Sequence, residues 1–254
     1  MSDPITESKY NAPIDDKQSF LDHLLELRTR IIRSLVIVFT IFLVLFFFSD
    51  AIWGFIAEPL LKNLPAQGEM IATEPASPFF APLKLAIYIS IFLGIPFLLH
   101  EMWAFISPGL YSHEKRFAWP LLISSTFLFY SGIAFAHFIV FPIVFKFMAT
   151  IVPPDILIMP DISQYLDFIL KMFFGFGLAF QIPVATLLLA WSGLATAKSI
   201  AGKRPYAIIG CFVIGMLLTP PDVISQLLLA FPCWLLFELG IIAARMAENT
   251  KKID

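Results

Sequence analysis

Charged residues are scarce in this sequence. Only 14% of its 254 residues are Asp, Glu, Lys or Arg, whereas soluble globular proteins carry about 25%. Hydrophobic residues make up 59% and the mean hydropathy is +0.84, so a soluble core cannot bury all the apolar surface. The net charge of −2 gives no general attraction to polyanions, and we expect no nucleic-acid partner. The lipid bilayer is therefore the expected surrounding.

Motifs for catalysis and for metal binding are lacking as well. The two cysteines, Cys211 and Cys233, lie in apolar runs and give neither a disulfide framework nor metal-ligand spacing. His100 and His113 are each followed by Glu, as in the helical zinc-protease motif, but neither has a second His one turn later. The sequence also has no nucleophile elbow, phosphate loop or dinucleotide fingerprint. We predict a protein that is not an enzyme and that needs no metal or cofactor.

Six apolar segments are present instead, and about 20 apolar residues suffice to cross roughly 30 Å of hydrocarbon. They predict an all-α polytopic membrane protein with kinked spans, because Pro96 and Pro183 interrupt two of the segments. The last two spans are predicted to be short, the fifth with thirteen residues and the sixth with fifteen residues before Glu238. The predicted spans are approximately 31–49, 82–103, 117–145, 164–191, 206–218 and 223–241, in one membrane domain over 19–245.

Polar ends flank this domain. Residues 1–18 predict a disordered tail, a short amphipathic helix is expected to lie at the membrane surface from Ser19, and residues 246–254 predict a second tail. With six spans both termini lie on one side, and that side holds thirteen of the seventeen Lys and Arg residues. Because basic residues are retained on the cytoplasmic side, we predict that both termini are cytoplasmic.

Acidic residues at the cytoplasmic boundary are the candidate binding groups. Glu26 and Glu114 would suit guanidinium groups, since the planar fork of Arg pairs bidentately with a carboxylate. Two simpler interpretations stay open: Glu26 and Arg30 have the i, i+4 spacing of an intrahelical ion pair, and Glu114 lies in a charged run that water can solvate. Inside the fourth span, Gln181 is either a contact for a partner or a hydrogen bond between helices.

Several segments, taken in order along the chain, resemble TatC, the multispanning subunit of the twin-arginine protein translocase. The resemblance runs from about residue 19 to 245. It is carried by the motifs DHLLELRTR (22–30), MIAT (70–73), SPFF (77–80), WAFISPGLY (103–111), HEKR (113–116), KRPY (203–206) and LTPPDV (218–223).

This resemblance implies a receptor for the twin-arginine signal peptides of folded proteins, which are exported with the proton-motive force. The implied partners are the single-span proteins TatA and TatB and further copies of the chain, in a bacterial inner membrane. The implied signal-peptide patch comprises Glu26, Glu114, Phe105 and Arg28. Residues that match family positions linked to translocation, structure or partner contacts are Pro59, Tyr130, Gln181 and Asp222.

One position departs from the family pattern. TatC proteins commonly carry Glu where this chain has Gln181, and Gln can form hydrogen bonds but cannot hold a charge. The two short spans also suggest that the bilayer is thinned beside them, where TatA would gather. A secondary transporter of a small solute is the main alternative, and an intramembrane protease built from Ser124 and His137 is a third.

Overall fold

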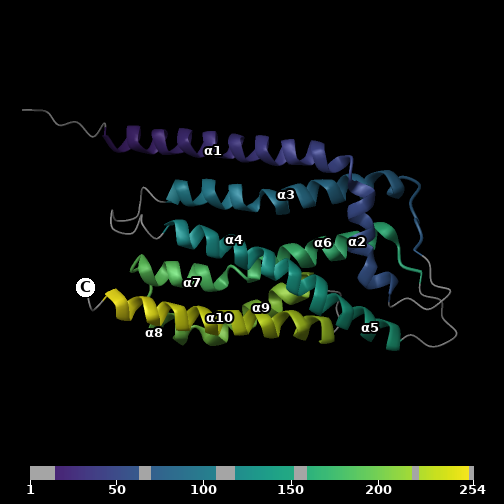
Figure 1. Cartoon of the computed structure of the whole chain (residues 1–254). Coiled ribbons are helices and arrows are strands. Elements are labelled where there is room, and N and C mark those ends of the chain that lie inside the picture. The colour runs from purple at the N-terminus through teal and green to yellow at the C-terminus, as the bar shows by residue number, and fades with distance from the viewer. Residues whose placement is uncertain (1–14, 63–69, 107–117, 152–158, 219–222, 252–254) are drawn as a thin grey trace, which may run out of the picture.

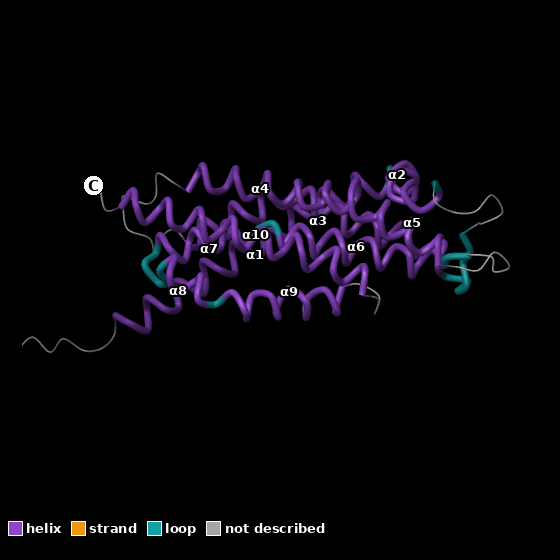
Figure 2. Tube along the Cα trace, turned by 90° about the horizontal axis from the view of Figure 1, so that it is seen from below, coloured by secondary structure: helices purple, strands orange, loops and turns teal. Residues whose placement is uncertain are grey.

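The computed structural model describes residues 15–62, 70–106, 118–151, 159–218 and 223–251. These residues form helices joined by turns, and the only β-type pairing among them is an isolated bridge between Ile71 and Asp161. Loops and turns gather mainly at the two ends of the helical bundle (Figure 2). The predicted all-α class is confirmed.

The helices follow one another along the chain. They are α1 (Asp15–Phe46), α2 (Ser49–Leu61), α3 (Ser77–Ile106), α4 (Ala118–Phe135), a π-helical turn η3 (Ala136–Val140), α5 (Phe141–Ile151), α6 (Ile162–Ala179), α7 (Ile182–Trp191), α8 (Ala197–Gly202), α9 (Arg204–Leu218) and α10 (Val223–Lys251).

Five helical stretches are long and apolar enough to cross a membrane, and a sixth is apolar but shorter. The five are Leu24–Phe46, Ser77–Phe105, Trp119–Ile151, Ile162–Trp191 and Gln226–Met246, and the shorter one is Arg204–Met216. Figure 1 shows these helices running along one common direction, with α2 crossing them at one end. The start of α1 and the end of α10 are both at the opposite end of the bundle (Figure 1), which we call the terminal end; the end beside α2 is the far end.

The structure corrects the sequence prediction at the N-terminal side. Helix α1 begins at Asp15 and continues without a break to Phe46, so residues 15–18 are not a disordered tail and no separate surface helix precedes the first span. Residues 1–14 lie outside the described part of the chain. Between the first two predicted spans, α2 occupies twelve of the residues 50–81, and α3 begins five residues before the predicted start of its span.

The prediction of two short final spans is correct for α9 and wrong for α10. Helix α10 contains an apolar stretch of 21 residues, Gln226–Met246, and continues to Lys251 through most of the predicted tail. Glu238 does not end it, because Arg204 binds the carboxylate with two hydrogen bonds of 2.6 and 2.8 Å and neutralises its charge.

The core lies around α6, which packs against α4 and the π-helical turn. Phe173 and Phe141 place their ring centroids 5.3 Å apart, and Ile169 and Leu170 are fully buried beside them. At the crossing of α4 and α6 a Cβ on Gly132 would lie only 2.6 Å from the carbonyl oxygen of Phe176, so only glycine permits this approach. This crossing fixes the register between the two helices.

Helix α1 lies at the edge of the bundle, where it packs on α3 (Figure 1). None of the residues in its most apolar window is buried, and its exposed side chains are mostly large and apolar. An exposed apolar surface of this kind is expected where lipid takes the place of water. The side of α1 that faces α3 is half-buried, and Val38 and Ile41 lie against Gly94 of α3.

Candidate functional site

A polar cluster centred on Arg30 lies midway along α1, beside the last turns of α3. The guanidinium group donates from Nε and Nη2 to Oε1 of Glu26, at 3.1 and 2.5 Å. Because residues four apart lie on the same helix face, this contact is the intrahelical ion pair that the spacing predicted. The simpler interpretation of Glu26 is thus realised within α1.

Helix α3 completes the arrangement. Arg30 Nη1 donates to Oε2 of Glu101 at 3.1 Å, and Nη2 donates to the carbonyl oxygen of Ala104 at 3.2 Å. The side chains of Arg30, Glu26 and Glu101 are 20%, 36% and 14% exposed, so the ion pairs are partly shielded from water. We call Arg30, Glu26, Glu101 and the Ala104 carbonyl the Arg30 cluster.

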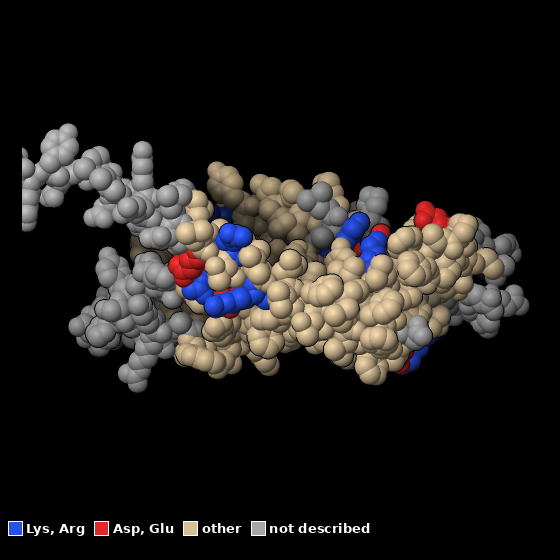
Figure 3. All heavy atoms as spheres, turned by 90° about the horizontal axis from the view of Figure 1, so that it is seen from above, with Lys and Arg blue, Asp and Glu red and all other residues tan. Residues whose placement is uncertain are grey.

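Two carboxylates share one guanidinium in this cluster. The guanidinium of Arg30 lies between Glu26 of α1 and Glu101 of α3, in a place partly shielded from water. On the face shown in Figure 3, acidic and basic side chains form one group toward the terminal end, and a few more lie toward the far end. The carboxylate and carbonyl oxygens of the Arg30 cluster are acceptors for cationic groups, and their arrangement matches a planar guanidinium.

The other three residues predicted for the signal-peptide patch are Phe105, Arg28 and Glu114. Phe105 follows Ala104 at the end of α3 and is half-buried, so it lies next to the Arg30 cluster. Arg28 is exposed on α1, two residues from both Glu26 and Arg30, and residues two apart do not share a helix face. Glu114 lies outside the described residues.

Glu101 was not predicted as a site residue. The sequence placed it only at the end of the second span. No local pattern connects it to Arg30, which is 71 residues away, because the register of α1 on α3 brings the two together.

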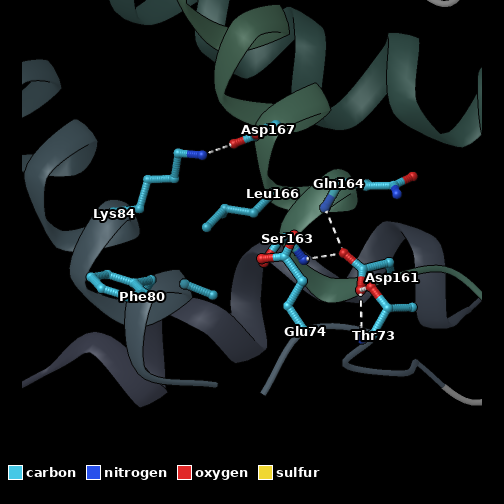
Figure 4. Close-up of a pocket in the computed structure, with 10 residues that line it drawn as sticks. Thr73, Glu74, Phe80, Lys84, Asp161, Ser163, Gln164, Leu166 and Asp167 are labelled. Carbon is cyan, nitrogen blue, oxygen red and sulfur yellow. Dashed lines mark hydrogen bonds and ion pairs between the residues drawn. The ribbon is translucent and has the colours of Figure 1, made fainter. Parts of the chain in front are cut away.

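A second polar cluster lies at the far end, where α3, α6 and residues 70–76 meet (Figure 4). Asp161 accepts hydrogen bonds from the backbone N–H groups of Ser163 and Gln164 with Oδ1, and so caps the start of α6. Its Oδ2 accepts from the backbone N–H and the hydroxyl of Thr73, at 2.9 and 2.7 Å. These bonds, led by the Thr73 hydroxyl, lower the pKa of Asp161 to about 2.

A cavity of about 310 Å³ lies beside Asp161. Lys84 of α3 and Asp167 of α6 form an ion pair at its wall, and Figure 4 shows the two side chains pointing toward each other across it. Thr73 binds Asp161 and Lys84 binds Asp167. We therefore interpret this cluster as structural: it holds residues 70–76 and α3 against α6.

No metal centre was predicted, and the described residues contain no group of three His, Cys, Asp or Glu side chains that would hold one. The protease alternative gains no support from the geometry. Ser124 donates to the Leu121 carbonyl of its own helix, and His137 is buried against Phe55 with ring centroids 4.5 Å apart.

Comparison with known proteins identifies the family. The family model for TatC, the Sec-independent protein translocase protein, matches residues 22–232. The chain belongs to the TatC family. This is a family of transport proteins and not of enzymes, as the missing catalytic motifs predicted.

The curated TatC relatives cover nearly the whole chain. The TatC of Azotobacter chroococcum is 54% identical over 227 residues, which are 89% of this chain and 89% of that protein. Haemophilus influenzae TatC is 51% identical over 92% of each chain, and Escherichia coli K12 TatC is 47% identical over 91% of this chain and 90% of its own length.

Two solved structures have the same fold. A crystal structure of the twin-arginine translocase receptor TatC superposes with a TM-score of 0.80, at 36% identity, over 89% of this chain and 99% of that one. A second, of TatC in the detergent DDM, superposes with a TM-score of 0.79 at 35% identity, over 87% and 99%. The alternative of a small-solute transporter gains no support from these comparisons.

In this TatC chain Tyr130 has a structural contact. Pro96 inside α3 has no N–H, so the carbonyl oxygen of Phe92, four residues earlier, lacks its helical donor. The Tyr130 hydroxyl of α4 donates to that oxygen at 3.1 Å. The contact joins α4 to α3 at the proline that we predicted to kink the span.

Gln181 also contacts another helix of its own chain. It lies at the break between α6 and α7, and its Nε2 donates to the carbonyl oxygen of Ser125 in α4 at 2.8 Å. This hydrogen bond is the helix–helix alternative that the sequence left open. It uses the amide N–H of Gln, which an ionised Glu at this position would not have.

Pro59 and Asp222 are the remaining predicted residues. Pro59 is part of α2, one turn after Phe55. Asp222 lies between α9 and α10, outside the described residues. The ion pair of Arg204 with Glu238 joins the start of α9 to α10.

Proposed function

We propose that this TatC chain is the membrane receptor for twin-arginine signal peptides, and that the Arg30 cluster is part of the surface that binds them. The observation that carries the proposal is chemical. Two carboxylates, one from α1 and one from α3, converge at the terminal end of the bundle on a guanidinium group. A surface that already binds one arginine side chain in this way suits a ligand that offers two.

The proposal includes an orientation. Both termini are cytoplasmic in a bacterial inner membrane with six spans, α9 being the fifth. The sequence assigns thirteen of the seventeen Lys and Arg residues to the side of the termini, which supports the orientation. The start of α1 and the end of α10 lie at the same end of the bundle (Figure 1), which supports it as well. Signal peptides of proteins made in the cytoplasm then meet the Arg30 cluster before any membrane crossing.

Cysteine labelling tests this orientation. Cys211 and Cys233 are both buried, so a single cysteine at Lys198 in α8 or at Lys62 after α2 is the accessible thiol. In intact inner-membrane spheroplasts, a membrane-impermeant maleimide is expected to label Lys62→Cys and to label Lys198→Cys only after permeabilisation. The reverse pattern would contradict the orientation.

Partners are proposed from the family and from the surface. TatA and TatB, the single-span partners that the family implies, would meet the apolar sides of the spans, where large side chains such as Ile209 and Val213 of α9 are exposed. Further copies of the chain would join the same assembly, which uses the proton-motive force to move the folded cargo. Binding of the signal peptide is the step that the Arg30 cluster supports directly.

A peptide-binding measurement tests the receptor proposal. Detergent-solubilised protein is titrated with a fluorescent peptide that carries the Arg-Arg pair, and with a matched peptide in which both arginines are lysine. We expect tighter binding of the Arg-Arg peptide, because an ammonium cannot reproduce the planar fork. Equal affinities for the two peptides would refute recognition of arginine.

A further inference from the structure

We infer that Glu26, Glu101 and the Ala104 carbonyl form a guanidinium-binding site that Arg30 occupies as an internal ligand, and that an arginine of the signal peptide displaces Arg30 from it. Glu101 is then a further ligand-binding residue. The inference rests on the proposed receptor function and specifies one of its contacts.

The geometry is that of a built site for one planar cation. Four N–H···O contacts, between 2.5 and 3.2 Å, connect the guanidinium of Arg30 with acceptors on two helices. Three of its nitrogens are used, and they point in the fixed directions of the fork. A lysine ammonium at the same place is a single point and would not reach the acceptors of both helices together.

The ligand inside this site is attached by a flexible side chain. Arg30 is anchored on the lipid-exposed edge helix α1, and Arg28 and Arg33 on the same helix leave their side chains exposed. The side chain of Arg30 can therefore turn away from α3 toward the exposed face of α1 without a movement of the backbone. Once it has left, two partly shielded carboxylates remain without it, and their repulsion favours the entry of another guanidinium.

Internal occupation sets a threshold for recognition. A ligand must compete with Arg30, so its apparent affinity is reduced by the fraction of molecules in which Arg30 has left the site. A second guanidinium replaces all the contacts that are lost, whereas an ammonium replaces only some of them. Arg30 thus lowers the apparent affinity for every ligand by the same factor, and the preference for arginine over lysine comes from the acceptors of the site.

Removal of the internal ligand is the direct test. Full-length Arg30→Gln is expected to bind the Arg-Arg peptide about tenfold more tightly than wild type, the factor that applies if Arg30 leaves the site in about one molecule in ten. The double variant Arg30→Gln/Glu101→Gln is expected to lose this gain. Arg33→Gln is the matched control, because Arg33 is exposed one turn further along α1 and makes no ion pair among the described residues.

A small probe separates this inference from the receptor proposal. N-acetyl-arginine methylamide is expected to raise the Tm of Arg30→Gln and to leave the Tm of wild type and of the double variant unchanged; the lysine analogue is expected to have no effect on any of them. If Arg30→Gln does not fold, Arg30→Lys takes its place, with a smaller expected gain, because lysine vacates part of the site.

The two possible failures give different results. If the Arg-Arg peptide binds nowhere while the arginine probe stabilises Arg30→Gln, the receptor proposal fails and the guanidinium site stands. If wild type binds the peptide but Arg30→Gln binds it no more tightly and gains no stability from the probe, the internal-ligand inference is overturned.

Discussion

The hydroxyl of Tyr130 in α4 donates a hydrogen bond to the carbonyl oxygen of Phe92 in α3, and this is the oxygen that Pro96 leaves without its helical donor. Pro96 and Tyr130 are 34 positions apart in the sequence, but both act on the same carbonyl oxygen: Pro96 removes its helical donor and Tyr130 supplies another. In hydrocarbon no water is present to donate a hydrogen bond to an unpaired carbonyl, so the contact stabilises a kinked span.

Tyr130→Phe is therefore expected to lower the free energy of unfolding by about 1 kcal/mol, the size typical of a hydrogen bond between membrane helices. The loss should be smaller in a Pro96→Ala background, because alanine restores the N–H that satisfies the Phe92 oxygen. Thermal unfolding in detergent measures both effects. Tyr88→Phe is the control, since the Tyr88 hydroxyl makes no hydrogen bond within the described chain. Equal losses for Tyr130→Phe in both backgrounds would contradict the assignment.

Arg204 and Glu238 explain why α10 continues past an acidic residue. Their side chains are partly exposed, so breaking the pair with Arg204→Gln is expected to lower the Tm, but by less than the loss of a fully buried pair would. The exchanged pair Arg204→Glu/Glu238→Arg should recover part of that loss. The measurement is the Tm in detergent, and an Arg204→Gln variant as stable as wild type would show that the pair is not needed.

The lowered pKa of Asp161, at the far end of the bundle, makes the stability of the folded protein depend on pH. Its pKa is about 2 in the folded protein, against an ordinary value of 3.8, because Thr73 and the start of α6 donate hydrogen bonds to the charged form. The stabilisation is complete above the ordinary pKa and is lost as the pH falls toward about 2. The Tm of wild type should thus exceed that of Asp161→Asn at neutral pH, and the difference should shrink through this window.

The control for this pH experiment is Glu74→Gln, which changes an exposed side chain in the same segment. It is expected to follow wild type at every pH. A Tm difference between wild type and Asp161→Asn that stays constant from neutral pH down to about 2 would show that the charge of Asp161 does not stabilise the fold.

Helix α9 has fifteen residues, which span about 22 Å and fall short of a bilayer core of roughly 30 Å. If this mismatch thins the membrane where cargo crosses, inserting four leucines after Ile214 should reduce export of a twin-arginine reporter protein while peptide binding stays normal. Four residues add about one helical turn and so preserve the faces of the helix. Four leucines inserted after Phe39, in the longer span of α1, are the control. Unchanged export in the α9 variant would count against thinning.

Hydropathy was sufficient to predict the membrane segments, because burial in lipid depends on the composition of each segment alone. It failed where a charge is neutralised by a distant partner, and we ended the sixth span too early because nothing near Glu238 in the sequence points to Arg204. The missing N–H of Pro96 predicts that the Phe92 oxygen needs a donor. It does not say that Tyr130 supplies it.

The candidate site was predicted in part for the same reason. The i, i+4 pair of Glu26 with Arg30 is local and could be read from spacing. The contribution of Glu101 could not be predicted from spacing, because it depends on the register of α1 against α3. That register comes from packing between segments about 70 residues apart. Family resemblance pointed to Glu26 and Phe105, but it gave no reason to name Glu101, which lies beside the recognised motif.

The most direct test of arginine recognition is the ratio of two dissociation constants, that of the Lys-Lys peptide divided by that of the Arg-Arg peptide, measured for wild type, Glu26→Gln and Glu58→Gln. Glu58 forms an i, i+4 ion pair with Lys62 of the same length as that of Glu26 with Arg30, but on α2 at the far end, which makes it the matched control. We predict a ratio of about ten or more for wild type and Glu58→Gln, and a ratio near one for Glu26→Gln, because the planar acceptor set is lost. A Glu26→Gln variant that folds normally and keeps the wild-type ratio would contradict the claim that this cluster recognises arginine.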